Sequence, residues 1–364
     1  MPSIDRIASG WKARYRSPDG RQRSKNFARK SDAERFLVEM EHTKLTGAYV
    51  DPAAGRVTLK AYAEQWRKMQ VHRVSTAALV ETNLRRHVYP TLGDRALGSI
   101  RPSEVQAWVR GRSDDLSAGT VQVVFRYVSA IFRAAVADRL IASSPCIGIK
   151  LPKVEHAQVE PLAVEEVEAL IAAAPDRYRA LVVFAAGTGL RQGECFGLTV
   201  DRIDFLRRTV KVDRQLLLMP GGGPVLAPPK TEASRRIVPL PEVVVDALAA
   251  HLAQYPAGAG GFVFANDGGN PIRRTRFSDM WRPLVRRAGL PEGVGFHQLR
   301  HFYASLLIRH GESVKTVQLR LGHASAVETL NTYSHLWPDS DDRTREAVDL
   351  VLGPATESLA RADG

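Results

Sequence analysis

Residues 295–336 read GFHQLRHFYASLLIRHGESVKTVQLRLGHASAVETLNTYSHL and hold a dense set of reactive side chains. His297 and Arg300 are three residues apart, so a helix would place them on one face. His323 follows in an LGH triplet, and Tyr333 comes ten residues after it. A hydroxyl nucleophile, imidazoles and a guanidinium fit attack on a phosphodiester whose developing charge is held by cationic side chains.

The same stretch lacks the patterns of two other kinds of site. No carboxylate is spaced to bind a metal ion there, and no Gly-rich loop with a Lys is present to cradle a nucleotide. A zinc site from these histidines is also disfavoured, because no pair has a suitably spaced Cys or carboxylate partner. The sequence therefore predicts no metal and no cofactor.

The motifs, taken in order, resemble those of the tyrosine recombinases, the phage integrase family. HQLRH, LGH and TYSH are similar to the C-terminal motifs of that family, and TGLRQGE at 188–194 is similar to its first motif. Lys230-Thr231 matches the Lys that the family carries on a β-hairpin between its two Arg motifs. Gln298 departs from the pattern, where many relatives are acidic, but that position is not catalytic in the family. The resemblance spans about residues 161–350 and is weaker upstream.

The resemblance implies a role for each matching residue. Tyr333 would attack phosphorus and form a 3′-phosphotyrosyl link, which conserves the bond without ATP. Arg191 and Arg300 would grip the non-bridging oxygens, and Lys230 would protonate the leaving 5′ oxygen. His297 would act as a general acid–base group, and His323 would donate a further hydrogen bond to the phosphate.

Other residues near these motifs have structural interpretations. Glu194 lies three residues after Arg191, where it is spaced to orient that guanidinium. His301 and His335 are interpreted as helix packing or capping residues. Cys195 is interpreted as a small buried residue rather than a nucleophile.

Composition points to the partner. The net charge of +12 and the pI near 9.9 indicate a polyanion, most simply double-stranded DNA, although a basic protein without such a partner remains an alternative. Two cysteines far apart in sequence predict no disulfide framework and fit a reducing cytoplasm. No apolar run approaches membrane-spanning length and no signal peptide opens the chain, so we expect a cytoplasmic protein of a bacterial host, nucleoid-associated when active and without a membrane partner.

Residues 1–50 are predicted to form a small DNA-binding module. Residues 11–16 alternate apolar and basic side chains, SPDG at 17–20 predicts a turn, and residues 21–27 return as a second strand with alternate basic residues. Residues 31–34 have capping-box spacing before a helix to about Leu45. The module resembles the arm-binding domain of phage-type integrases, and a solvated hairpin is the alternative. Its candidate DNA contacts are Lys12, Arg14, Arg16, Arg21, Arg23 and Lys25.

Two further domains are expected. Residues 56–145 have helical periodicity that includes a helix from Leu79 ending at Pro90, and they resemble the helical, SAM-like core-binding domain of the family. Residues 47–56 and 143–158 are predicted linkers. Residues 159–350 form the expected catalytic domain, mainly helical with a small antiparallel sheet whose strands at 209–212 and 236–239 flank the Lys230 loop. The fold class is thus α+β, mostly α.

The function that these features imply is site-specific recombination by a phage or mobile-element integrase. Four protomers on DNA would exchange strands through a Holliday junction at core and arm-type sites. A directionality factor or a DNA-bending host protein is left open as a further partner. Two alternatives remain, a type IB topoisomerase and a non-catalytic DNA-binding protein of the same fold.

Overall fold

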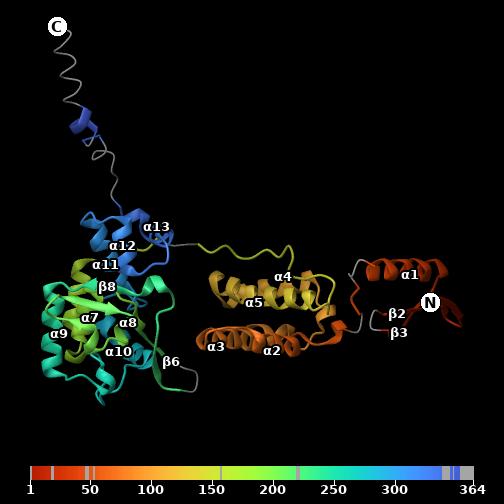
Figure 1. Ribbon diagram of the computed structural model, residues 1–364, viewed down its shortest axis with the longest axis horizontal. Coiled ribbons are helices and arrows are strands. Elements are labelled where there is room, and N and C mark those ends of the chain that lie inside the picture. Colours follow the sequence, from red (N-terminus) through yellow and green to blue (C-terminus); the bar gives the residue numbers. More distant parts are fainter. Residues whose placement is uncertain are drawn as a thin grey trace, which may run out of the picture. The chain divides into compact units, whose positions relative to one another are not determined.

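The computed structural model describes residues 2–17, 20–45, 49–51, 54–155, 158–218, 222–337, 345–346 and 348–352. The chain divides into two compact units, residues 1–155 and residues 156–364 (Figure 1). Helices dominate, and all the sheets in the described residues are small and antiparallel. This confirms the predicted α+β, mostly α fold class.

The first unit opens with a three-stranded sheet in the order β1-β2-β3, followed by helix α1 (Lys30–Leu45). The strands are β1 (Ser3–Ile7), β2 (Gly10–Arg16) and β3 (Gln22–Phe27). The prediction of two strands was wrong by one, because β1 has only two apolar residues, neither fully buried, and so carries no clear alternation. At the predicted turn the Gly20 N–H donates to the Ser17 carbonyl over 2.9 Å. Pro18 and Asp19 lie outside the described residues.

Helix α1 covers one face of this sheet and gives it a small core. Ala13 and Ala33 are fully buried between the two layers. The ring of Phe36 on α1 packs edge-on against Tyr15 and tilted against Phe27, with centroids 5.5 and 5.1 Å apart. A sheet of this size needs such a packed helix for stability.

The rest of the first unit is helical. Its elements are η1 (Ala54–Arg56), α2 (Leu59–Met69), α3 (Val74–Asn83), η2 (Leu84–Gly93), η3 (Leu97–Ser99), α4 (Pro102–Asp115) and α5 (Ala118–Ala137). Thr58 and Ser117 cap α2 and α5 by accepting from backbone N–H groups with their hydroxyls. The predicted end at Pro90 was wrong: α3 continues as the π-helix η2 through Pro90 to Gly93. In a π-helical turn the backbone does not form the i→i−4 hydrogen bonds of an α-helix, which a proline would interrupt. The helix therefore continues past Pro90.

Helix α5 is long and apolar enough to cross a membrane by length and composition. Its apolar side chains instead form the centre of the helical core, where Val121, Val128, Ile131 and Phe132 are fully buried. The helix therefore acts as the core element of this region.

Both predicted linkers are partly packed. At 47–56, only residues 49–51 and 54–56 are described; Asp51 pairs with Arg23, and Gly55 lies against Gly98. At 143–158, the Gln106 side chain exchanges two hydrogen bonds with the backbone of Lys150, at 3.0 and 2.9 Å. These contacts bind the first half of the second linker to the helical region, and the boundary between the two units falls after residue 155.

The second unit surrounds a larger core with helices and two small sheets. Its helices are α6 (Val164–Ala173), α7 (Asp176–Thr188), α8 (Gln192–Phe196), η4 (Val200–Arg202), η5 (Glu232–Ser234), α9 (Glu242–Gln254), η6 (Ala259–Gly261), α10 (Arg274–Arg287), α11 (Gln298–Arg309), α12 (Val314–Leu321), α13 (Ala326–Tyr333) and η7 (Ser334–Leu336). A separate small apolar cluster joins α11, α12 and α13, and Tyr333 belongs to it.

The sheets lie between α8 and α9 in the sequence. Strands β4 (Ile203–Asp204), β5 (Thr209–Val212) and β8 (Arg236–Pro239) form one antiparallel sheet, as predicted for the last two. The Gly/Pro-rich loop expected between β5 and β8 contains a second hairpin, β6 (Gln215–Leu218) with β7 (Pro224–Ala227). Prolines at 224, 228 and 229 hid these strands, because proline lacks the N–H that a central strand requires.

Candidate active site

A tight turn after α7 presents the first arginine. Gly189 ends α7 in the left-handed conformation, φ 63°, and an added Cβ would lie 2.4 Å from the ring of Tyr303. The chain then enters α8 with Arg191 at its N-cap, where the backbone N–H donates to Glu194 over 3.0 Å. Glu194 also contacts the Arg191 guanidinium at 3.2 Å, consistent with the predicted orienting role.

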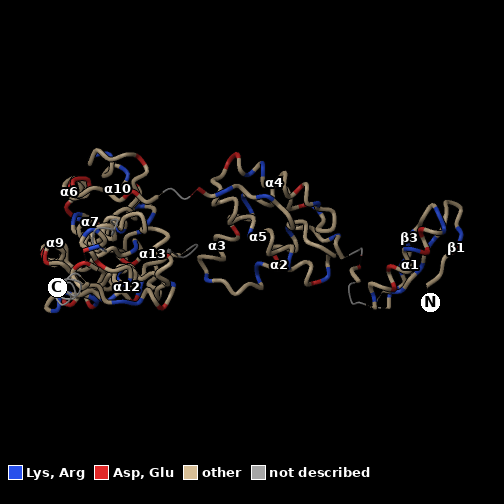
Figure 2. The backbone as a smooth tube through the Cα atoms, turned by 90° about the horizontal axis from the view of Figure 1, so that it is seen from above, with Lys and Arg blue, Asp and Glu red and all other residues tan. Residues whose placement is uncertain are grey.

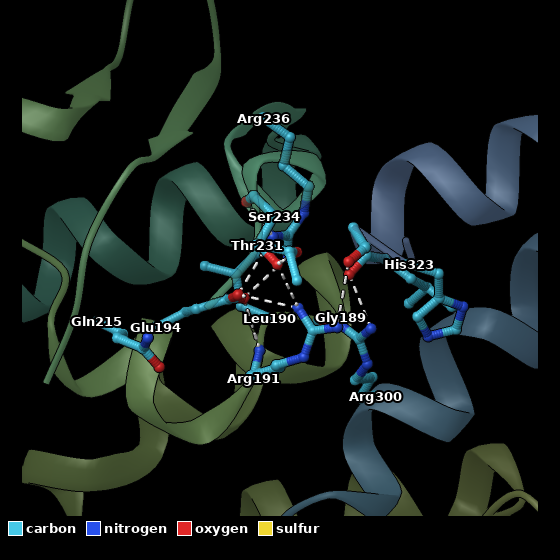
Figure 3. Close-up of polar contacts among 12 residues, drawn as sticks. Gly189, Leu190, Arg191, Glu194, Gln215, Thr231, Ser234, Arg236, Arg300 and His323 are labelled. Atoms are coloured by element: carbon cyan, nitrogen blue, oxygen red, sulfur yellow. Dashed lines mark hydrogen bonds and ion pairs between the residues drawn. The ribbon is translucent and has the colours of Figure 1, made fainter. Parts of the chain in front are cut away.

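Three arginines converge on the end of α12. Arg300 donates to the Leu321 carbonyl over 2.7 Å, Arg191 to the Gly322 carbonyl over 3.1 Å, and Arg236 to the Arg320 carbonyl over 2.7 Å. Arg300 also donates to the Gly189 carbonyl over 2.7 Å, so α7, α11 and α12 are joined at this point (Figure 3). Arg300 is only 2% exposed. Burial and the neighbouring Arg191 charge lower its pKa to about 9, which leaves it protonated at neutral pH.

Arg236 is a site residue that the sequence analysis missed. It lies at the start of β8 and forms an ion pair with Glu194, 2.9 Å between Nη2 and Oε2. Burial raises the pKa of Glu194, but the charges of Arg236 and Arg191 outweigh burial and hold it below its usual value. The local sequence RIVP does not indicate whether Arg236 is buried or exposed, because its partner Glu194 is 42 residues away in the sequence.

His323 directly follows residues 320–322, whose carbonyls accept these three arginine hydrogen bonds. Gly322 ends α12 in the left-handed conformation, φ 66°, and turns the chain so that the imidazole is buried. Its Nδ1 lies 2.8 Å from the Thr329 hydroxyl. Burial, followed by the charges of Arg300 and Arg191, lowers the pKa of His323 to about 3, so the ring is neutral near pH 7.

Tyr333 ends α13 beside these groups and is 1% exposed. Its ring lies parallel to that of His323, with centroids 6.4 Å apart and an interplanar angle of 10°. Its hydroxyl lies 2.8 Å from Nδ1 of His301. Burial raises the pKa of the phenol to about 12. His301, interpreted as a helix packing or capping residue, packs its ring against those of His297 and Tyr333 and also makes this hydrogen bond, which its place on one helix does not reveal. His335 contacts the Val159 carbonyl at 2.9 Å.

His297 occupies the N-cap position of α11 without a side-chain capping hydrogen bond, and its side chain is exposed. Its ring meets that of His301 edge to face, with centroids 4.8 Å apart. Burial and the charges of Arg300 and Arg191 lower its pKa. Together with Arg191 it lines a cavity of about 1190 Å³ whose wall includes Phe277, Trp281 and Phe296.

Lys230 lies on the exposed connection between β7 and β8. The next residues bring this connection to the site: the hydroxyls of Thr231 and Ser234 are 2.9 Å apart, and Arg191 contacts Ser234 at 3.5 Å. The predicted residues Arg191, His297, Arg300, His323 and Tyr333 are therefore brought together, with Lys230 on an adjoining loop. No group of three His, Cys, Asp or Glu suited to a metal ion occurs in the described ranges.

The six candidate DNA contacts of the N-terminal module do not all lie on one face of the sheet. Lys12, Arg14 and Arg16 alternate with the buried Ala13 and Tyr15 on β2, so they point away from α1. The register pairs Arg23 with Tyr15 and Lys25 with Ala13, which places both on the opposite face, toward α1.

The contacts of these two residues agree with that register. The Lys25 ammonium lies 4.9 Å from the centre of the Phe36 ring, and Arg23 pairs with Asp51. Arg23 and Lys25 therefore do not share a face with Lys12, Arg14 and Arg16, because the register places the odd positions of both strands on the side toward α1. Arg21 is exposed just before β3, and Figure 2 shows the basic positions of the chain.

The comparisons with known proteins point to one family. Residues 160–339 match the model of the phage integrase family, and residues 59–150 match that of the phage integrase central domain. The chain is 29% identical to the prophage phiRv2 integrase of Mycobacterium tuberculosis, covering 94% of this chain and 92% of that protein. It is 31% identical to a tyrosine recombinase XerC-like protein of Caldanaerobacter subterraneus subsp. tengcongensis, covering 65% of this chain and 67% of the relative.

Solved structures extend the likeness to the fold. The Tn1549 transposon integrase, solved with a circular intermediate DNA, superposes with a TM-score of 0.70 at 25% identity, covering 81% of this chain and 99% of that one. A lambda integrase dimer bound to a core site has the same fold at 18% identity, with a TM-score of 0.62 over 93% of this chain and 97% of that one. The chain belongs to the phage integrase family and is a tyrosine-type site-specific recombinase.

Proposed function

We propose that the chain cleaves and rejoins double-stranded DNA at specific sites through a covalent bond between Tyr333 and the 3′ phosphate. The observation that carries this proposal is the convergence of Arg191, Arg300 and His323 beside the Tyr333 ring. Arg300 is a buried cation whose described hydrogen bonds go to carbonyl groups, so a phosphate would give it the anionic partner it lacks there.

Each polar group then has a task in the transfer. Arg191 and Arg300 bind the non-bridging oxygens and offset the charge of the pentacovalent transition state. His323, neutral and buried, donates from Nε2 to the same phosphate, while His297 contacts it from the cap of α11 or exchanges a proton. Lys230 gives a proton to the departing 5′ oxygen. The phosphotyrosyl ester keeps the bond energy, so rejoining requires no nucleotide cofactor.

The remaining features concern the assembly. The three domains, residues 1–50, 56–145 and 159–350, act as arm-binding, core-binding and catalytic domains. Four protomers assemble on DNA and resolve a Holliday junction, in the cytoplasm and on the nucleoid of a bacterial host. A directionality factor or a DNA-bending host protein assists the choice between integration and excision. The lambda integrase tetramer solved on a Holliday junction is the precedent for this arrangement.

The test is covalent capture on a nicked suicide duplex. A core site is first selected from a pool of random duplexes by binding to the full-length protein, and the selected duplex is nicked beside the cleavage position. Wild-type protein should form an adduct that survives denaturing electrophoresis, and Tyr333→Phe should form none while binding the duplex with nearly unchanged affinity. Adduct formation by Tyr333→Phe would refute the assignment of the nucleophile, and relaxation of supercoiled plasmid without exchange of sites would favour the type IB topoisomerase alternative.

A further inference from the structure

The hydroxyl of Tyr333 has one hydrogen-bond partner in the described part of the chain, Nδ1 of His301 at 2.8 Å. His301 follows Arg300 directly on α11, so the helix that holds a phosphate-binding guanidinium also carries this imidazole. The ring contacts those of Tyr333 and His297, with centroids 5.6 and 4.8 Å away. None of the roles given above to the six catalytic residues uses His301.

The tautomer of the neutral His301 ring decides the direction of the hydrogen bond, and the phenol donates when the ring carries its proton on Nε2. Burial, His297 and Arg300 lower the pKa of His301 to about 4, so its imidazole is neutral near pH 7. A neutral ring has one nitrogen with a free lone pair, and a phenol has one hydrogen to donate. The phenol donating to an unprotonated Nδ1 therefore satisfies both groups in a site that is otherwise cationic.

The nucleophile needs such an acceptor. Burial raises the pKa of Tyr333 to about 12, so only about one phenol in 10⁵ is ionised at pH 7. A phenol attacks phosphorus effectively only as it loses its proton, and general-base catalysis of this kind contributes about 10²–10⁴-fold.

We propose that His301 is the catalytic base that takes the phenolic proton of Tyr333 during DNA cleavage. In this step the Tyr333 Oη–P bond forms, the P–O5′ bond breaks, and the phenolic proton moves to Nδ1 of His301. The leaving oxygen takes its proton from another acid, Lys230, so His301 ends as an imidazolium and returns its proton to Oη when the strands rejoin. The inference rests on the proposed function, since it requires that Tyr333 is the nucleophile.

The neighbouring histidines are less well placed for this task. His323 presents its ring face to Tyr333, and its Nδ1 contacts Thr329 at 2.8 Å. His297 contacts the ring of His301.

The charge balance also favours a proton on His301 once DNA is bound. The groups around the pair are Arg300 and His297 at α11, His323 in the turn between α12 and α13, Glu328 on α13, and Arg191 at the start of α8. Burial is the main cause of the lowered pKa of His301, and the charges of His297 and Arg300 lower it further. A phosphate anion between Arg191 and Arg300 would offset this second contribution. The base would therefore gain strength when substrate is bound.

Two substitutions separate proton transfer from simple positioning. In His301→Asn the amide oxygen can still accept the phenolic hydrogen bond but cannot take a proton, whereas His301→Phe keeps ring packing and loses the acceptor. The exposed His310, at the end of the same helix, supplies the control variant His310→Asn. The melting temperature and the duplex affinity of each full-length variant are first measured and compared with those of the wild type. Each protein is then assayed for single-turnover adduct formation on the suicide duplex from pH 6 to 9.

We expect both His301 variants to cleave about 10²-fold or more slowly and His310→Asn to cleave at the wild-type rate. The rate of His301→Asn should rise with pH as the phenol ionises by itself. Replacing Tyr333 with 3,5-difluorotyrosine, whose phenol is more acidic, should restore cleavage in His301→Asn but not in Lys230→Ala.

Other results would overturn the assignment. His301→Asn at the wild-type rate, or a slow His301→Asn that difluorotyrosine fails to restore, would show that His301 only positions Tyr333. A wild-type protein that forms no adduct would instead refute the proposed function, and the base with it, so the two failures are distinguishable.

Discussion

Arg236 and Glu194 form a buried ion pair, with Nη2 and Oε2 2.9 Å apart and side chains that are 6% and 3% exposed. Arg236 extends this pair to α12 through the Arg320 carbonyl, and Glu194 extends it to Arg191. Arg191 is thereby held by the Glu194 carboxylate of α8, and the charge of that carboxylate is neutralised by Arg236 of β8. This arrangement leaves Arg191, 35% exposed, as the more accessible guanidinium of the three-residue network.

Glu194→Gln should destabilise the second unit, because it leaves Arg236 buried without a counter-charge. We expect the free energy of unfolding at pH 7 to fall by about 3–5 kcal/mol. The folded-state pKa of Glu194 is below its usual value, so the carboxylate stabilises the fold above that usual value and loses the effect as pH falls through the folded-state pKa.

Urea titrations at pH 7, 5 and 3.5 measure this effect. The difference in the free energy of unfolding between wild type and Glu194→Gln should become smaller as the pH falls. Glu232→Gln is the matched control, because Glu232 is 87% exposed and pairs with Arg235 on the surface. Equal losses for the two variants would contradict a special role for the buried pair.

Arg191→Ala should slow adduct formation by about 10²-fold or more, the scale for losing one preorganised donor to a developing charge. Duplex affinity should change far less, because one side chain makes up a small part of a large interface. Arg207→Ala serves as the control, since that side chain is 86% exposed. Rapid-quench rates and binding isotherms on the same duplex separate the two effects; a parallel loss of both would make Arg191 an ordinary DNA-binding residue.

Lys230→Ala should block cleavage of normal DNA but cleave a duplex with a 5′-bridging phosphorothiolate, because the thiolate departs without a proton. Lys211→Ala is the control, a Lys on the neighbouring strand β5 that is 62% exposed. Adduct yields on the two substrates give the answer. A Lys230→Ala protein that stays inactive on the phosphorothiolate would point to phosphate binding alone.

Alanine at Lys12, Arg14 and Arg16 together should weaken binding of the full attachment region and flatten the plot of log affinity against log salt. The slope should change by about 0.9 for each phosphate that the variant no longer neutralises. Arg35→Ala, on an exposed position of α1, should leave the slope unchanged. Footprinting and salt titration check this, and a triple variant with the wild-type slope would exclude this sheet face as a DNA-binding surface.

The sequence determined the local elements and the identity of the reactive groups. The capping-box spacing of residues 31–34 and the alternation of residues 11–16 predicted α1 and β2, because these patterns depend on near neighbours alone. The resemblance of the motifs to those of the phage integrase family singled out Arg191, Arg300, His323 and Tyr333, which the fold brings to one place.

Only the tertiary structure decided which groups touch. The Arg236–Glu194 pair joins residues 42 apart, and the His301–Tyr333 contact joins residues 32 apart. Neither contact has a local signature in the sequence, since they depend on how β8 packs against α8 and how α13 packs against α11. The register of β2 and β3 likewise turned Arg23 and Lys25 toward α1, because one apolar face of the sheet had to be buried.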